Sequence, residues 1–140
     1  MDSKIVEFLD KEKICVLSVL MSDGSPHSAT VHFSYEGEPL RFFIQTTNTT
    51  VKVKSLLNGQ TAKASMVIGF SEKDWITFQM RGTAKIISDA DQLEELHKIH
   101  YKKQPEAERR KGPNTVFIEF TPNWWRYTDF NTHPLTVIEQ

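Results

Sequence analysis

The sequence lacks several features that would restrict its function. It has one cysteine, Cys15, which excludes an intramolecular disulfide and, in practice, a cysteine-based metal site. A lone thiol is typical of a reducing compartment. No apolar run approaches the ~18 residues that cross a bilayer, and the opening residues Met1–Lys4 do not resemble a signal peptide. We therefore expect a cytoplasmic protein with no membrane partner.

An excess of charge of one sign is also absent. The chain has 17 basic and 18 acidic residues, a net charge of -1, so we expect no nucleic-acid partner. No repeat or Pro/Gly-rich linker divides its 140 residues, which suit one domain over residues 1–140. Dinucleotide, P-loop, nucleophile-elbow and zinc-protease motifs are missing too, so a hydrolase is not indicated.

Alternating apolar and polar residues dominate what is present. This period of two predicts strands at residues 14–20, 27–35, 40–45, 62–70, 75–87, 115–120 and 124–130. Turn sequences after residues 20 and 35 predict that the first three strands form a meander. Short helices are predicted near residues 5–12, 51–57 and 90–99, with a charged helix end and loop at 102–113. The pattern predicts a mainly β, antiparallel barrel of six to seven strands with short flanking helices.

The segment Thr46–Lys52 is the most informative stretch. Its hydroxyl and amide side chains precede a helix start, where free backbone N–H groups favour an anion. Lys52 adds a positive charge suited to a phosphate. The alternative is a polar loop in which Thr49 or Thr50 only caps the helix, and the residues alone do not decide between the two.

Histidines do not indicate a metal site. His27 and His32 lie five apart on a predicted strand and therefore face opposite sides of the sheet. His97 and His100 have a helical spacing that permits shared ligation. No carboxylate or cysteine converges on them, so a solvated helix face is the favoured interpretation, and we expect no metal.

Aromatic residues gather in the last predicted strand. Trp125 and Tyr127 share one face and Trp124 lies on the other. At least one ring is expected in a core or interface, and stacking on a planar cofactor is an alternative. Cys15 lies within an apolar strand and is expected to be an inert core residue.

The order of these elements resembles the pyridoxamine 5′-phosphate oxidase-related family of split barrels that bind flavin mononucleotide (FMN). The matching motifs are a Gly-x-Pro turn, an aromatic-x-x-Thr followed six residues later by Lys, a Gly-x-Ala element and a late Thr-Pro. They occur here as Gly24–Pro26, Phe43–Thr46 with Lys52, Gly82–Ala84 and Thr121–Pro122. Each motif is short, and their order and spacing over nearly the whole chain carry the resemblance.

The resemblance implies a split β-barrel homodimer that binds FMN at the dimer interface. The residues that it implies for cofactor binding are Thr30, Val31, His32, Gln45, Thr46, Thr50, Val51, Lys52, Thr77 and Trp125. Thr46, Thr50, Val51 and Lys52 correspond to the part that holds the FMN phosphate, and Thr30–His32 to the part along the flavin ring. Large aromatic residues, which a small barrel does not need, also favour a homodimer.

The chain departs from true pyridoxamine-phosphate oxidases at three places. Ala29 stands where they carry an arginine, Ser34 where they carry a lysine, and Trp125–Asp129 where they carry a basic segment. Small general-stress-type members are the closer likeness. We therefore expect an FMN-dependent oxidoreductase of unknown substrate, without vitamin B6 oxidase activity. The alternatives are a non-catalytic dimer that binds flavin or haem, with His27 or His32 as axial ligand, and a dimer with an empty site.

Overall fold

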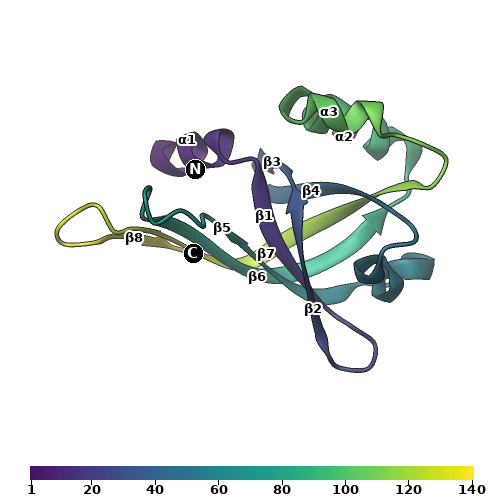
Figure 1. Ribbon diagram of the computed structural model, residues 1–140, viewed down its shortest axis with the longest axis horizontal. Helices are drawn as coiled ribbons and strands as arrows, with labels where there is room; N and C mark the ends of the chain where they lie inside the picture. The colour runs from purple at the N-terminus through teal and green to yellow at the C-terminus, as the bar shows by residue number, and fades with distance from the viewer.

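The computed structural model describes all residues, 1–140, as one curled antiparallel sheet with short helices at its margins (Figure 1). The elements are α1 (Ser3–Lys11), β1 (Ile14–Leu20), β2 (Pro26–His32), β3 (Ser34–Gly37), β4 (Leu40–Thr47), η1 (Val51–Gly59), β5 (Ala62–Ile68), β6 (Ile76–Ile87), α2 (Ala90–Lys103), α3 (Pro105–Arg109), β7 (Thr115–Asp129) and β8 (Thr136–Glu139). The predicted mainly β split-barrel fold is confirmed.

The sheet order explains how the barrel closes. Neighbouring strands follow the order β2-β1-β5-β6-β7-β4-β3, and β8 pairs with β7. β2 and β3 are thus the two edges of the sheet, although only Phe33 separates them in the chain. The predicted single strand at residues 27–35, and with it the simple meander, is wrong. The alternation continues through the buried Phe33, so the sequence pattern conceals the crossing from one edge to the other.

Two further differences concern the end of the chain. The strands predicted at 115–120 and 124–130 form the single strand β7. Its pairing with β6 is irregular where Arg81 faces Trp124 and Gly82 faces Pro122. Close backbone approach requires glycine there, because a Cβ on Gly82 would lie 2.0 Å from the Thr121 carbonyl oxygen. β8 was not predicted, because its four residues are too few to show a period.

The core fills the inside of the curled sheet. Phenylalanines 33, 42, 78 and 120 are buried there, and α1 and η1 close the ends with Ile5, Leu9, Val53 and Leu56. Each such side chain stabilises the fold by roughly 1.5–3 kcal/mol. α2 lies outside the barrel, over Phe43 and Phe117, and together with α3 it lies at the upper right in Figure 1. None of the helices is both long and apolar enough to span a membrane.

Candidate functional site

A cavity of about 620 Å³ opens beside the edge strand β2, and β4 and the α2–α3 segment form its other walls. Four residues predicted for cofactor binding line it, namely Thr30, Val31, His32 and Gln45. Thr30 and His32 are exposed, whereas Val31 points into the barrel. The structure therefore brings the predicted ring-binding strand and the end of β4 together around one space, within the size range of small-molecule sites.

The segment predicted to hold a phosphate continues directly from Gln45. Thr46 and Thr50 are half-buried, with their hydroxyl oxygens 3.2 Å apart, and the Thr50 hydroxyl donates to the Thr47 carbonyl at 3.1 Å. Thr50 precedes η1 without capping it through its side chain. The backbone N–H groups of Val51 and Lys52 find no acceptor in the chain. The predicted helix start with free donors is therefore present, and the capping alternative for Thr50 is not.

Lys52 is buried without a partner. Its exposed fraction is 7%, and its ammonium makes neither an ion pair nor a hydrogen bond within the chain. Burial lowers the pKa of this ammonium. Arg41 Nε is the one fully buried side-chain nitrogen or oxygen without a partner, so the Lys52 ammonium reaches solvent at its tip. A cation that is partly buried and unpaired is free to meet an anion from outside the chain. Lys54, two residues on, is exposed.

Gln45 is fixed by both ends of its amide. Its Nε2 donates to the Ala107 carbonyl at 2.8 Å, and its Oε1 accepts from the Tyr101 hydroxyl at 2.6 Å. These bonds tie β4 to α2 and α3. Gln45 therefore lines the cavity mainly as a support for its wall, with one N–H group left for a ligand.

Three cations around the cavity were not identified from the sequence. They are Lys13, Lys103 and Arg110. Lys103 is held inside by a hydrogen bond to the Leu9 carbonyl and by the Phe33 ring, 4.1 Å from its Nζ, and burial lowers its pKa to about 8. Lys13 and Arg110 are exposed and unpaired. The basic run at residues 109–111 was visible in the sequence, but its position beside the cavity depends on where α3 lies.

The prediction that His97 and His100 lie on a solvated helix face is wrong for His100. It is 1% exposed, and its Nδ1 lies 2.7 Å from the hydroxyl oxygen of Ser34, which is also buried. Burial, with added repulsion from His32, His97 and Lys103, lowers the pKa of His100 to about 4. His100 is therefore neutral near pH 7. His97 is half-buried against Tyr101 and Phe117.

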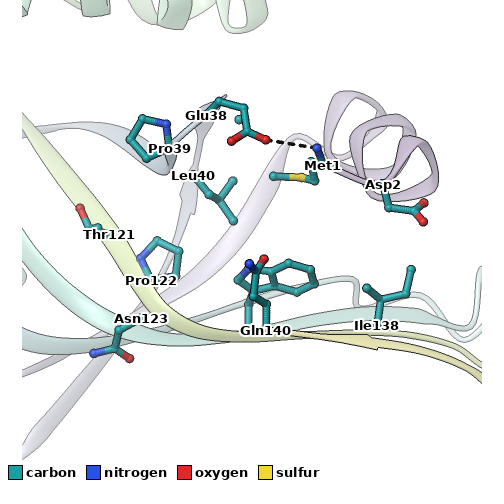
Figure 2. Close-up of a pocket in the computed structure, with 12 residues that line it drawn as sticks. Met1, Asp2, Glu38, Pro39, Leu40, Thr121, Pro122, Asn123, Ile138 and Gln140 are labelled. Carbon is teal, nitrogen blue, oxygen red and sulfur yellow. Dashed lines mark hydrogen bonds and ion pairs between the residues drawn. The ribbon is translucent and has the colours of Figure 1, made fainter.

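Thr77 and Trp125 lie apart from the other predicted residues. Thr77 is on β6, three strands from β2 and so about 14 Å away across the sheet. Trp125 stacks on Phe78 at 5.3 Å between ring centres, and it lines a different cavity of about 640 Å³ near Leu40 and Pro122 (Figure 2). Within one chain these two residues do not join the site.

The arrangement suits an anion attached to a larger polar molecule. Free N–H groups, hydroxyls and an ammonium are the usual ligands of a phosphate. The cavity, which is lined by the preceding residue Gln45 but not by Thr46, Thr50 or Lys52, has room for a planar group. No group of three His, Cys, Asp or Glu side chains is placed to hold a metal ion. His100 borders the cavity but is 1% exposed, and its partner Ser34 is fully buried, so this pair offers no open nucleophile.

Comparison with known proteins was informative at the level of family and fold. Residues 1–129 match the sequence model of a family described as pyridoxamine 5′-phosphate oxidase. No curated protein sequence matches the chain significantly.

Solved structures with a similar fold include the General Stress Protein 26 from Bacillus anthracis strain Sterne. It is 22% identical, with a TM-score of 0.67 over 89% of this chain and 90% of that chain. A pyridoxamine 5′-phosphate oxidase-related, FMN-binding protein from Nostoc punctiforme is 14% identical, with a TM-score of 0.66 over 89% and 78%. A haem-binding protein from Mycobacterium smegmatis is 13% identical, with a TM-score of 0.72 over 94% and 54%. At these identities the likeness shows a shared fold.

Proposed function

The chain belongs to the pyridoxamine 5′-phosphate oxidase family, and from that premise we propose that it binds FMN and acts as an FMN-dependent oxidoreductase on a small molecule. When bound, the flavin supplies the electron or hydride transfer, and the protein supplies position and electrostatics. Resemblance to an FMN-binding structure supports this assignment.

The unpaired ammonium of the largely buried residue Lys52 is the observation that carries the proposal. The FMN phosphate would lie against Lys52, the free N–H groups of Val51 and Lys52, and the hydroxyls of Thr46 and Thr50. This set offers one full positive charge and several neutral donors. It fits a phosphate better than a neutral group, because only an anion offsets the cost of the buried cation.

The flavin ring would lie along β2 in the adjoining cavity, beside Thr30 and His32. Lys13, Lys103 and Arg110 outnumber the one acidic residue, Glu106, at the same cavity, and this excess of positive charge favours electron-rich or anionic molecules. Vitamin B6 phosphate oxidation is not part of the proposal. Ser34, at the position of the oxidases' lysine, is buried and bonded to His100.

A homodimer is part of the proposal. On the outer face of the sheet, β1 and β5 carry five half-buried, uncharged side chains, Ile14, Val16, Ser18, Ser65 and Val67, and the exposed Lys63 lies at the end of this face. Uncharged centres are typical of protein–protein interfaces, and a closed two-fold pair is the commonest assembly. Light scattering at micromolar concentration is expected to give twice the chain mass, and a monomer mass would contradict the dimer.

Titration with FMN tests the cofactor assignment. We expect a yellow complex, and Lys52→Ala is expected to weaken FMN binding roughly tenfold to a hundredfold, because a charge-assisted hydrogen bond contributes about 1.5–3 kcal/mol. Riboflavin, which has no phosphate, is expected to bind both proteins alike.

Lys54→Ala is the matched control, because Lys54 has the same charge and is exposed. Equal FMN affinity of Lys52→Ala and the unmodified protein, or equal damage by Lys54→Ala, would contradict the phosphate site. The visible spectrum also separates flavin from haem, for which the exposed His32 in the same cavity is the candidate ligand.

A further inference from the structure

Lys103, the last residue of α2, lies between two cavities of this protein. It lines the cavity beside β2, and it is the one residue of that wall that also lines a second cavity of about 700 Å³. Asp10, Tyr35 and Lys102 are among the other residues of the second cavity. We call it the α1–α2 cavity, because α1 and α2 lie on either side of β3 along the upper side of Figure 1. It is separate from the proposed flavin site.

The amine of Lys103 is held in one position without a counter-charge. Its Nζ donates to the carbonyl of Leu9 and lies 4.1 Å from the centre of the Phe33 ring and 5.5 Å from that of Tyr35. Asp10 lines the same cavity but forms no ion pair with it. A carboxylate in direct contact would keep the amine protonated. The amine is therefore positioned at a cavity wall with space between it and the nearest carboxylate.

A lysine in these surroundings is a stronger nucleophile at neutral pH than an ordinary lysine. Burial lowers the pKa of Lys103 to about 8, against a smaller opposing effect of nearby acidic groups. Near pH 8 about half of the amine is then neutral, compared with roughly one part in 250 for a lysine of ordinary pKa. The neutral amine keeps an N–H for the Leu9 carbonyl and has a free lone pair. Desolvated lysines of this kind form imines with carbonyl compounds.

The groups that face Lys103 come from every element around it. Asp10 is on α1, Tyr35 is on β3 and the neutral His100 is one turn earlier on α2. The other titratable groups near it or around the two cavities are Glu12, Lys13, Cys15, His32, Glu36, Lys102, Glu106 and Arg110.

Asp10 and Tyr35 form a proton-transfer pair at the α1–α2 cavity. The Tyr35 hydroxyl donates to Asp10 Oδ1 at 2.6 Å, and this bond fixes the carboxyl group of an otherwise exposed side chain. Imine formation requires protons to leave the attacking nitrogen and to reach the departing oxygen, and a positioned carboxyl group accelerates both transfers. A nucleophilic amine and a proton carrier thus line the same space.

We propose that Lys103 forms an imine with small aldehydes that enter the α1–α2 cavity. The lone pair of Nζ attacks the carbonyl carbon, and a C–N bond forms as the C=O bond becomes single. Asp10 passes the two amine protons in turn to the oxygen, which leaves as water. Amine and aldehyde therefore give imine and water, with no oxidant or reductant, and hydrolysis reverses the reaction. This function goes beyond flavin binding and uses the opposite side of Lys103.

Reductive trapping tests this assignment. The purified full-length chain is incubated with glycolaldehyde and sodium cyanoborohydride, which converts the imine to a stable secondary amine, and peptide mass spectrometry locates the label. At pH 8 Lys103 is expected to be labelled about tenfold faster than Lys102, the exposed neighbour at the same cavity. Labelling of Lys103 should level off above about pH 8, whereas labelling of Lys102 should continue to rise. Equal rates, or no label on Lys103, would overturn the proposal.

Two variants separate the roles of the residues. Lys103→Arg keeps a charged donor for Leu9, and it should abolish labelling at this position without changing that of Lys102. Asp10→Asn keeps a partner for Tyr35 and should slow labelling of Lys103 about tenfold through loss of proton transfer. If Asp10 acted only through its charge, the same variant would speed labelling, because Asp10 raises the pKa of Lys103. Faster labelling would therefore overturn the role of Asp10. Neither measurement needs flavin, so both outcomes are independent of the proposed function.

Discussion

Two buried polar regions of this protein differ in whether their groups have partners. Under the C-terminal end of α2, Gln104 Nε2 donates to the carbonyls of Lys13 and Phe33, each at 3.0 Å, and His100 pairs with Ser34. We call this region the seam, because it covers the point where the chain crosses from β2 to β3. In the segment Thr46–Lys52, by contrast, the ammonium of Lys52 has no partner in the chain.

The difference separates structure from function. Buried polar groups in native proteins are nearly always hydrogen-bonded, and an exception calls for an explanation. The side chains of Gln104, His100 and Ser34 in the seam have hydrogen-bond partners, so they explain how two edges of the sheet are held around Phe33. Lys52 has no partner within the chain and its ammonium reaches solvent, so it is open to a ligand. Changes in the seam should therefore affect stability, and changes at Lys52 should affect binding.

The largest expected effect is on Gln104. Gln104→Ala removes a donor to two carbonyls at the closure of the barrel. The Lys13 carbonyl keeps the N–H of Phe33 at 3.2 Å, whereas the Phe33 carbonyl loses its donor. One unsatisfied buried carbonyl costs about 1–3 kcal/mol and the second lost hydrogen bond about 0.5–1.5 kcal/mol, so the free energy of unfolding should fall by about 2–4 kcal/mol in urea titration. Gln104→Glu, which keeps the size but loses the donor, should be at least as damaging. A loss below about 1 kcal/mol for both variants would show that these hydrogen bonds do not stabilise the seam.

A feature of this protein was predictable from the sequence when the residues that form it lie close together along the chain. The segment Thr46–Lys52 is contiguous, so its residue types alone offered a phosphate site as one of two interpretations. The seam joins Gln104 to Lys13 and Phe33, which are 91 and 71 residues away. No local period reports such a contact, and for that reason the crossing at Phe33 and the burial of His100 were missed. Lys13 and Arg110 were missed because α3 brings them together only in three dimensions.

The second effect is a dependence of stability on pH. The pKa of His100 is lowered to about 4 in the folded chain, whereas an unfolded histidine titrates near pH 6.5. The unfolded state therefore takes up the proton first. The stabilisation is complete above about pH 6.5 and is lost as the pH falls towards 4, by about 3 kcal/mol in all. His97, whose pKa burial also lowers, contributes in the same direction.

His100→Asn provides the control for this dependence. Asparagine does not titrate and still offers Ser34 a hydrogen bond, so the variant should lose most of the slope between pH 6.5 and 4. The measurement is urea unfolding at several pH values in this window. An unchanged slope in the variant would show that other groups cause the loss of stability in acid.

The smallest effect is expected at Lys52, and it has the opposite sign. Lys52→Met keeps the length of the side chain but removes a buried charge that has no partner in the free protein. The burial that lowers the pKa of the ammonium also opposes folding with the charge in place, so the variant should unfold at higher urea concentration, by roughly 1 kcal/mol. Its FMN affinity should fall as in Lys52→Ala. Lys54→Met, on the exposed position, should change neither quantity by more than about 0.5 kcal/mol. If Lys52→Met destabilises the free protein, the ammonium has a structural partner, and the contrast with the seam no longer identifies a binding site.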